Sequence, residues 1–199
     1  MYTLPEVVTL FNVQQNSEVV AKLVRLTRDR AAKQIDGTWW NVPVSKTLRE
    51  QEDDHHWQWR KIVGEHHNHR AWEAVGVQGP DEGIEGAMVY RIDAKSQIDY
   101  GQGALYVDRI ATAPRNRPWL VGTSKYQGVG TVLLFEAVRH SYLLGLRGRV
   151  WLSSLPSERT RRFYDQKGFE VIFEDADGMI DYELPTVKAV EWLEAEGFL

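Results

Sequence analysis

The chain has 199 residues, of which 43% are hydrophobic, and a formal net charge of −4. This length is enough for one well-buried core. A net charge this small argues against nucleic acid as the main partner. No apolar run reaches the ~18 residues of a membrane-spanning helix. The absence of cysteine excludes disulfides, thiolate nucleophiles and cysteine-based zinc sites. We therefore expect a single cytoplasmic domain over residues 1–199, with no signal peptide at its start.

The first hundred residues give the weaker structural signals. Alternation of apolar and polar residues predicts three strands, at residues 7–13, 71–77 and 83–92. The segment Gly79-Pro80-Asp81-Glu82-Gly83 is rich in turn residues and favours a hairpin between the last two strands. Residues 18–26 fit either a strand or a helix. Ser45 is expected to cap a helix that runs to about residue 66.

The pattern is sharper from residue 104 onward. Strand, glycine loop, helix, strand, helix and strand follow one another across residues 104–173. The predicted elements are a strand at 104–114, a helix at 128–145, a strand at 149–154 and a helix from Ser157 to Gln166 that begins at a turn at Pro156. Gly168 is expected to end the second helix as a C-terminal cap. A strand at 179–184 and an amphipathic helix at 186–196 complete the chain.

The most informative segment is Lys125-Tyr126-Gln127-Gly128-Val129-Gly130-Thr131, directly before a predicted helix. Two glycines two residues apart let the backbone turn tightly and leave N–H groups uncovered by side chains. The helix adds its unpaired first-turn N–H groups and the positive end of its dipole. The segment therefore predicts an anion site, above all for a pyrophosphate. It matches neither the dinucleotide-binding fingerprint nor the P-loop.

Three motifs in this order resemble the GNAT superfamily of acyl-CoA-dependent N-acyltransferases. Residues 125–130 match the family's phosphate loop, Arg/Gln-x-x-Gly-x-Gly/Ala, except for Lys at the first position. Ala111-Thr112-Ala113-Pro114 loosely matches the Val-x-Pro sequence that ends the preceding strand. Phe163-Tyr164-Asp165-Gln166-Lys167-Gly168-Phe169 matches the aromatic-Tyr pair ahead of Gly-Phe. The resemblance covers roughly residues 100–184, and the first hundred residues show no such match.

The resemblance implies an α/β (α+β) fold with a mixed, largely antiparallel sheet flanked by helices. The strands at 104–114 and 149–154 would be parallel neighbours that splay apart at their C-terminal ends, joined by the 128–145 helix in a right-handed crossover. Acetyl-CoA, or another short acyl-CoA, would enter there as co-substrate, and no metal is implied. The residues implied in binding it are Ile110, Ala111, Thr112, Lys125, Gln127, Gly128, Val129, Gly130, Thr131 and Ser157.

The distribution of charge is compatible with such a ligand. Residues 109–167 contain eleven Arg and Lys against three Asp and Glu, whereas residues 168–199 contain nine Asp and Glu against one Lys. A positive central segment suits the phosphates of coenzyme A. Solvated helix faces explain most of these charges individually.

The chain departs from the family pattern in two places. The connection between Pro114 and Gly128 is several residues longer than usual, so the insertion 116–124 either reshapes the mouth of the site or forms a surface loop. The tolerance of loops to changes in length favours the surface loop. The turn before the last helix of the motif has Ser157 where the family often has Asn. A serine can cap that helix, but its ability to replace an amide contact to the cofactor is in doubt.

Acyl transfer to an amine requires a base for the amine, N–H donors for the tetrahedral oxyanion and an acid for the leaving thiolate. By resemblance Tyr164 is the candidate acid, with packing beside Phe163 as the alternative. Asp108 is the candidate base, with a salt bridge to an arginine as the alternative and a water relay from Tyr106 also open. The backbone of residues 110–112 would pair with the pantetheine arm like an added strand and supply the oxyanion donor.

Three functions of different classes follow. The first is an N-acetyltransferase acting on a small-molecule amine or an exposed peptide or protein amine. The second is a catalytically silent acyl-CoA-binding module that keeps the glycine loop but needs neither Tyr164 nor Asp108. The third is an unrelated binder of a phosphate ligand. The acidic 50–54 segment is a weak indication of a cationic acceptor, and an exposed helix face explains it better. The oligomeric state, including a homodimer, stays open.

Two residue clusters have an open role. Five histidines, His55, His56, His66, His67 and His69, fall within fifteen residues, but no recognised motif supplies the third ligand and second shell that zinc requires. We interpret them as exposed or acceptor-site side chains and expect no metal site. Most of the eight tryptophans are expected in the core, while Trp39, Trp40 or Trp119 would equally suit a pocket wall.

Overall fold

The computed structural model describes residues 3–4, 7–66, 69–155 and 157–199, apart from the side chain of His66. The chain forms two compact units. The first comprises Met1–Val89 and Arg109–Leu133, and the second comprises Tyr90–Asp108 and Leu134–Leu199. The expectation of one domain over residues 1–199 stays a prediction.

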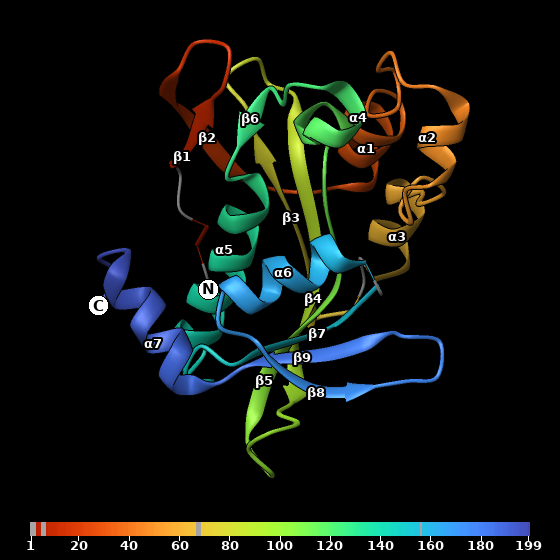
Figure 1. Cartoon of the computed structure of the whole chain (residues 1–199). Coiled ribbons are helices and arrows are strands. Elements are labelled where there is room, and N and C mark those ends of the chain that lie inside the picture. The colour runs from red at the N-terminus through yellow and green to blue at the C-terminus, as the bar shows by residue number, and fades with distance from the viewer. Residues whose placement is uncertain (1–2, 5–6, 67–68, 156) are drawn as a thin grey trace. The chain divides into compact units, whose positions relative to one another are not determined.

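The hydrogen-bonded strands follow one another in the order β6-β1-β2-β3-β4-β5-β7-β9-β8 (Figure 1). Their bounds are β1 Val8–Asn12, β2 Ser17–Arg25, β3 Trp72–Gln78, β4 Ile84–Lys95, β5 Gly103–Thr112, β6 Tyr126–Gln127, β7 Val150–Ser154, β8 Glu170–Glu174 and β9 Ile180–Leu184. The pairs β1–β2, β1–β6, β2–β3, β7–β9 and β8–β9 are antiparallel. The ambiguous segment 18–26 is thus a strand, paired on both of its edges.

The parallel pair expected from the sequence is present. β5 and β7 are parallel, with Leu105 opposite Val150 and Val107 opposite Leu152. Their pairing ends there, although β5 continues to Thr112 and β7 to Ser154. The mixed, mostly antiparallel sheet with a parallel pair is therefore confirmed.

The first unit contains the helical elements α1 Arg28–Ala31, η1 Ala32–Asp36, α2 Lys46–Glu50, α3 Trp59–His66, η2 Pro114–Asn116 and α4 Pro118–Val121. The prediction of one helix from Ser45 to about residue 66 is wrong. Ser45 does cap α2 through a hydrogen bond from the Leu48 N–H, but α2 ends at Glu50. α3 then begins separately, because the two carboxylate oxygens of Asp36 accept the N–H groups of Trp59 and Arg60 at 2.8 and 2.9 Å.

Tryptophans form the centre of the first unit's core. The fully buried Trp39 and Trp59 rings meet edge to face at a centroid distance of 5.8 Å. The Trp39 Nε1 donates to the Ile84 carbonyl at 2.7 Å, so the indole's polar atom is satisfied. Trp40 is half-buried and Trp119 is exposed. Trp39 was expected either in the core or in a pocket wall. It is in both, since it is buried and also borders a cavity described below.

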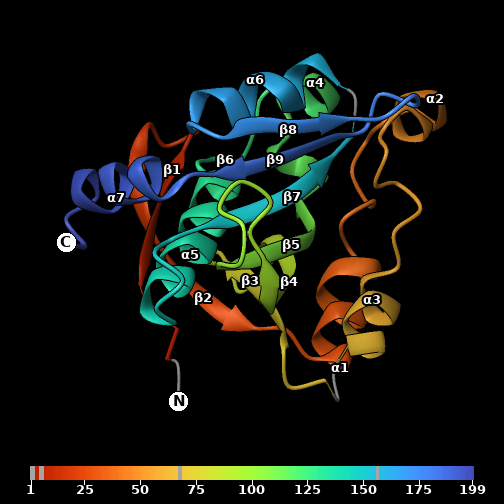
Figure 2. The ribbon, with the colours of Figure 1, turned by 90° about the horizontal axis from the view of Figure 1, so that it is seen from below.

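The second unit contains most of α5 (Val129–Leu143), with α6 Glu158–Gln166 and α7 Thr186–Ala195. Figures 1 and 2 show β7, β9 and β8 side by side with α6 lying along them. Ser157 caps α6 by accepting the Thr160 N–H at 3.1 Å, and Gly168 follows its end at φ +81°, as the sequence predicts. The predicted turn residue Pro156 lies outside the described residues. Among the described helices, none is long and apolar enough to cross a membrane.

Glu136 is an ionisable side chain buried inside α5. It is 1% exposed, and it accepts from Arg139 Nε at 3.0 Å through one oxygen, while the other has no hydrogen-bond partner in the described chain. Burial raises the pKa of Glu136 to about 7, only partly opposed by Arg139.

This raised pKa predicts that stability depends on pH. Below pH ~4.5 the carboxyl is protonated in the folded and unfolded chains alike, but between pH 4.5 and 7 only the unfolded chain ionises, so stability falls as pH rises. Glu136→Gln is expected to remove this dependence. Its stability relative to the unsubstituted protein should therefore rise by about 2–3 kcal/mol between pH 4.5 and pH 8. Urea unfolding of both proteins across this range measures it. A pH-independent difference would contradict the assignment.

Candidate functional site

The glycine loop presents backbone donors at the start of α5. Gly128 has φ +88°, and a Cβ placed there would meet no atom within 4 Å. Within the described chain, no hydrogen bond is made by the N–H groups of Val129, Gly130 and Thr131. Because these donors belong to the first turn of a 15-residue helix, they point out along its positive end. The arrangement can bind a phosphate.

Lys125 and Gln127, which precede the glycines, already have partners within the chain. The Lys125 Nζ donates to Asp81 Oδ2 at 2.5 Å and lies 3.7 Å from Glu85 Oε1. Burial by itself lowers the pKa of Lys125, but the hydrogen bond to Asp81 and the charge of Glu85 outweigh it and raise that pKa. Gln127 is exposed on β6 and pairs with Phe11 of β1. The lysine is thus already neutralised by two carboxylates.

Glu85 organises the approach to the glycine loop, and sequence reasoning did not single it out. Its side chain is fully buried, and its Oε2 accepts from Arg115 Nε and Asn116 Nδ2, both at 2.9 Å. Asn116 in turn accepts the Tyr126 N–H at 2.9 Å. The sequence did contain a signal for Glu85, because a carboxylate within the apolar stretch of β4 needs a partner when it is buried.

The insertion 116–124 is therefore not a plain surface loop. Asn116 is buried and links β4 to β6, while residues 118–121 form the short helix α4. Its second anchor is Arg117, which is 5% exposed. Loop length alone favoured the surface-loop interpretation, and the two buried anchors overturn it.

Arg117 joins the acidic segment to the end of β5. Its Nη1 donates to Glu52 Oε2 at 2.7 Å and to Asp54 Oδ1 at 2.6 Å, and its Nη2 pairs with Asp54 Oδ2. Burial lowers the pKa of Arg117, but the hydrogen bonds and charges of Asp54 and Glu52 prevail and raise it, so the guanidinium is charged. The interpretation of 50–54 as an exposed acidic face is wrong at these two residues, because Arg117 satisfies them.

The end of β5 offers fewer free backbone groups than the sequence suggests. Ala113 donates its N–H to the Glu85 carbonyl at 2.8 Å, so this backbone group just after β5 is bonded to the second residue of β4. The Thr112 carbonyl already accepts Arg117 Nε at 3.0 Å and Nη2 at 2.6 Å. The carbonyl of Thr112 is therefore already engaged, and the roles of Ile110, Ala111 and Thr112 toward a pantetheine arm stay predictions.

Gly86 lets α5 approach β4 closely. A Cβ at Gly86 would lie 2.5 Å from Val129 Cγ1 and 3.0 Å from Leu133 Cδ1. Both residues belong to the first turns of α5, so the backbone donors of the glycine loop depend on this contact.

We expect Gly86→Ala to push the start of α5 away from β4. The overlap should cost about 1–3 kcal/mol of stability and should weaken coenzyme A binding. Thermal unfolding and calorimetric titration measure the two effects. Gly101→Ala is the control, since it adds the same methyl at φ +82° where no atom lies within 4 Å. Gly86 has no positive φ, so strain at the backbone enters only the control, and unchanged coenzyme A affinity in Gly86→Ala would contradict the role of this contact.

Asp108 and Tyr164, the predicted catalytic residues, both lie in the second unit. Asp108 is half-buried on β5, on the same strand face as Tyr106, whose ring packs on Trp151 at 4.2 Å. Tyr164 is 5% exposed and lies against Phe169 and Tyr182, with ring centroids 5.5 and 5.4 Å away. Burial, with a smaller contribution from Tyr182, raises the pKa of Tyr164 far above its usual range. The phenol is therefore protonated at neutral pH.

The remaining predicted contact, Ser157, uses its hydroxyl within α6. Its Oγ lies 2.5 Å from Thr160 Oγ1 and accepts the Thr160 N–H. The hydroxyl is thus committed to capping the helix. A role of Ser157 toward a cofactor stays a prediction.

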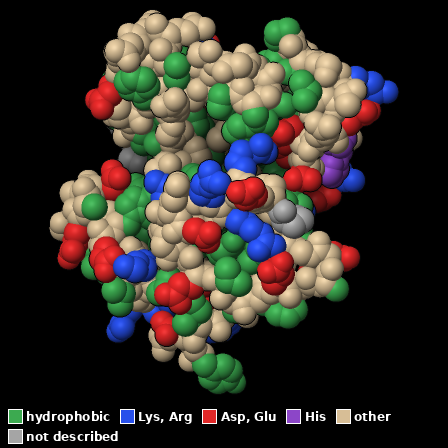
Figure 3. Space-filling model, viewed as in Figure 1, with side chains coloured by type: hydrophobic (Ala, Val, Ile, Leu, Met, Phe, Trp, Pro, Cys, Tyr) green, Lys and Arg blue, Asp and Glu red, His purple; other side chains and the backbone are tan. Residues whose placement is uncertain are grey.

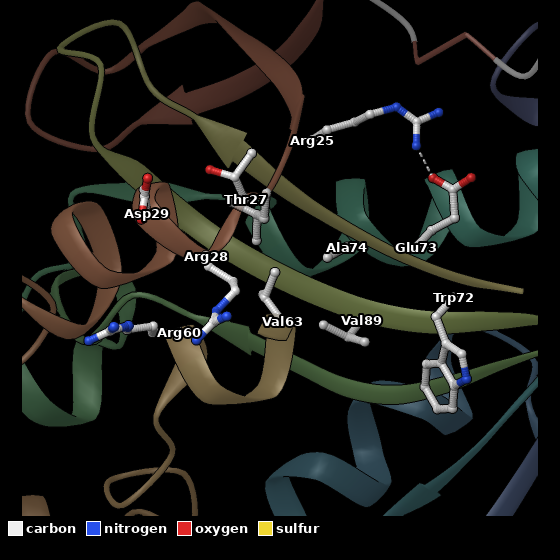
Figure 4. Close-up of a pocket in the computed structure, with 11 residues that line it drawn as sticks. Arg25, Thr27, Arg28, Asp29, Arg60, Val63, Trp72, Glu73, Ala74 and Val89 are labelled. Atoms are coloured by element: carbon white, nitrogen blue, oxygen red, sulfur yellow. Dashed lines mark hydrogen bonds and ion pairs between the residues drawn. The ribbon is translucent and has the colours of Figure 1, made fainter. Parts of the chain in front are cut away.

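Two cavities lie in the first unit. One, of about 560 Å³, is lined by the start of α1, α3, β3 and Val89 of β4 (Figure 4). The other, of about 960 Å³, is lined by η1, α3 and the loops beside them. It includes Trp39, Trp40, Trp57, His55 and His56.

The histidines do not form a metal cluster in the part of the chain that the structure describes. His55 and His56 face each other edge to face at 5.3 Å, and the His55 Nδ1 lies 2.7 Å from the Glu52 carbonyl. Figure 3 shows histidine and acidic side chains gathered on the surface over the α2–α3 segment. His67 and the side chain of His66 lie outside the described residues.

No protein-family model matches this sequence, and no curated protein matches it. Solved structures do share its fold. A mutant of the toxin AtaT, bound to the C-terminus of the antitoxin AtaR and acetyl-CoA, has a TM-score of 0.57 at 15% identity, over 87% of this chain and 98% of that one. The chain has the GNAT fold.

Two further structures agree. A chimera of spermidine N-acetyltransferase SpeG from Vibrio cholerae and hSSAT has a TM-score of 0.54 at 14% identity, over 85% of this chain and 98% of the chimera. The PaiA N-acetyltransferase of Thermoplasma acidophilum, in complex with coenzyme A, has a TM-score of 0.52 at 13% identity, over 82% and 97%. At such identities the likeness establishes the fold.

Proposed function

We propose that the protein is an N-acetyltransferase that transfers the acetyl group of acetyl-CoA to a primary amine. The observation that carries the proposal is the glycine loop, whose N–H groups at residues 129–131 are left without a partner at the start of α5, in a fold shared with acetyltransferases. Those donors would bind the pyrophosphate of the cofactor. The fold argues against an unrelated phosphate binder.

The backbone of β5 would hold the rest of the cofactor. The N–H groups of Ile110 and Thr112 and the carbonyl of Ile110 would pair with the pantetheine arm. One of these N–H groups would also stabilise the tetrahedral oxyanion. Arg117 supports this role by fixing the Thr112 carbonyl and thus the end of the strand.

The reaction would proceed by direct attack. The amine nitrogen forms a bond to the thioester carbonyl carbon and loses its proton to Asp108, directly or through water. The tetrahedral intermediate then collapses, the carbon–sulfur bond breaks, and Tyr164 donates its proton to the leaving thiolate. The raised pKa of Tyr164 keeps the phenol protonated until the thiolate develops. The products are the N-acetylated amine and coenzyme A.

A second candidate is an acyl-CoA-binding module without catalysis. The observation in its favour is the position of Tyr164 inside an aromatic cluster with Phe169 and Tyr182, where packing explains the residue equally well. Such a module would need the glycine loop alone.

Two measurements separate these functions. Calorimetric titration with coenzyme A and acetyl-CoA tests the binding site, and a thiol-release assay with a panel of amines tests the transfer. Binding with release of free thiol is expected. Binding without release for any amine would favour the silent module, and the absence of binding would remove both.

A further inference from the structure

The two cavities of the first unit meet at a pair of arginines. Arg28 and Arg60 line both the 560 Å³ and the 960 Å³ cavity. Figure 4 shows Arg28 reaching from the start of α1 toward α3, with Val63 and Val89 beside it and Trp72 at the far end. Arg28 and Arg60 are therefore the two residues that the linings of both cavities share.

Three of the four carboxylates that line the two cavities are already engaged. Both oxygens of Asp36 bind the first N–H groups of α3. Asp54 is held by Arg117, and Glu73 is held by Arg25. The remaining carboxylate, Asp29, is exposed in the first turn of α1. The acids of these cavities consequently offer little to a cationic ligand.

Arg28 and Arg60, by contrast, form no ion pair within the described residues. The side chain of Arg28 is placed by Gly64, because a Cβ at Gly64 would lie 2.8 Å from Arg28 Nε and 3.4 Å from its Cζ. The absence of a side chain on α3 at this point lets the guanidinium lie directly against the helix. These two arginines are thus available to an anion.

Aromatic rings form the walls of the larger cavity. Trp39 and Trp59 are buried, and Trp57 meets Trp59 edge to face at 5.9 Å. Trp40 is half-buried on the same lining. Such walls suit a flat, apolar group.

Two tryptophans of the larger cavity's lining lie against arginines, one of which belongs to β5. The Arg109 guanidinium, on β5, lies 5.3 Å from the ring centroid of Trp57. The Arg117 guanidinium lies 5.7 Å from the Trp40 ring and binds the Thr112 carbonyl. Both tryptophans line the cavity, so its aromatic wall contacts Arg109 of β5 and the arginine that holds the Thr112 carbonyl.

We propose that the acyl acceptor is an amine that also carries an anionic group on an apolar or aromatic frame, with Arg28 and Arg60 binding the anion and the tryptophans holding the frame. This acceptor class rests on the proposed function. It reverses the cationic acceptor suggested by the acidic 50–54 segment, because Arg117 neutralises Glu52 and Asp54. The positive lining would also lower the pKa of the acceptor's ammonium group and favour the neutral, reactive amine.

The test uses matched acceptors that differ in charge. L-Tryptophan is compared with L-tryptophanamide, O-phosphoethanolamine with ethanolamine, and spermidine serves as the cationic probe. Each is measured in two ways, by calorimetric binding to the protein saturated with coenzyme A and by thiol release with acetyl-CoA. We expect the anionic member of at least one pair to be preferred about tenfold or more in both. The pair that shows it identifies the anion as carboxylate or phosphate.

Variants then locate the anion site. Arg28→Gln and Arg60→Gln should each lower affinity and kcat/KM for the preferred anionic amine by about 10- to 100-fold, the scale of a charge-assisted hydrogen bond, and leave its neutral analogue unchanged. Gly64→Ala should act in the same direction by displacing Arg28. Lys33→Gln is the matched control, since this exposed lysine makes the same charge change outside both cavities.

The outcomes separate this proposal from the proposed function. Anion-selective binding without thiol release would keep the acceptor site and remove the catalysis. Thiol release with equal or better use of L-tryptophanamide, ethanolamine or spermidine would keep the catalysis and overturn the anionic acceptor. Binding of none of the probes, or equal losses for charged and neutral acceptors in the arginine variants, would also overturn it.

Discussion

Replacing Tyr164 by Phe is expected to lower turnover by about 10²–10⁴-fold while leaving the affinity for acetyl-CoA unchanged. This is the usual scale for a positioned general acid. The substitution removes the hydroxyl and keeps the ring, so the packing against Phe169 and Tyr182 is preserved. Steady-state thiol release gives turnover, and calorimetry gives the affinity. Because burial keeps the pKa of Tyr164 high, we expect no loss of activity from its ionisation between pH 7 and 9.

The matched control is Tyr182→Phe, which removes a hydroxyl from the neighbouring ring, 5.4 Å away between centroids. A large loss in the Tyr164 variant alone supports the role as acid. Weaker binding with unchanged turnover would instead make Tyr164 a contact to the cofactor. No change in either quantity would reduce it to a packing residue and favour the silent module.

Replacing Gly128 by Glu is expected to abolish binding of coenzyme A. The change places a carboxylate where the phosphates would lie and forces a side chain into the left-handed region at φ +88°. Gly128 is exposed and its Cβ would meet no atom within 4 Å, so the fold should survive. We expect an affinity loss of at least about 100-fold in calorimetry, with an unfolding transition lowered by the backbone strain of roughly 1–2 kcal/mol.

Gly122→Glu provides the control for charge and strain together. Gly122 is also exposed, lies at φ +77° and has open space at its Cβ, but it belongs to the end of α4 and not to the glycine loop. The two variants should unfold alike and differ in their binding of coenzyme A. Unchanged affinity in Gly128→Glu would show that the loop does not hold the pyrophosphate.

The part of the chain that carries the motifs, roughly residues 100–184, was more predictable than the rest, because its signals act between residues close together in sequence. Gly128 and Gly168 both adopt a positive φ, a conformation that glycine accepts more readily than other residues. Ser157 caps the helix that it precedes. The parallel pairing of β5 and β7 followed from their spacing around one helix. The roles of Asp108 and Tyr164 stay predictions, since a side chain's chemistry depends on neighbours that the pattern does not contain.

The N-terminal half shows what such patterns miss. The helix expected from Ser45 to residue 66 is broken because Asp36, which lies 23 residues before Trp59, caps α3 from another part of the chain. Charge-rich segments are usually exposed, so Glu52 and Asp54 were interpreted as solvated. Their partner Arg117 lies 65 and 63 residues away in sequence.

The sequence by itself determined the order β5, α5, β7, α6, β8, β9 and α7, the glycine loop at the start of α5 and the likeness to the GNAT fold. The reason is that periodicity, caps and glycine conformation act over a few residues. Only the tertiary structure decided which charges are neutralised and which are free. Arg117 and Lys125 are paired with carboxylates from distant segments, whereas Arg28 and Arg60 line the cavities without one in the described chain. The physical reason is that burial and ion pairing depend on chain segments brought together in space, and a single sequence does not record those distances.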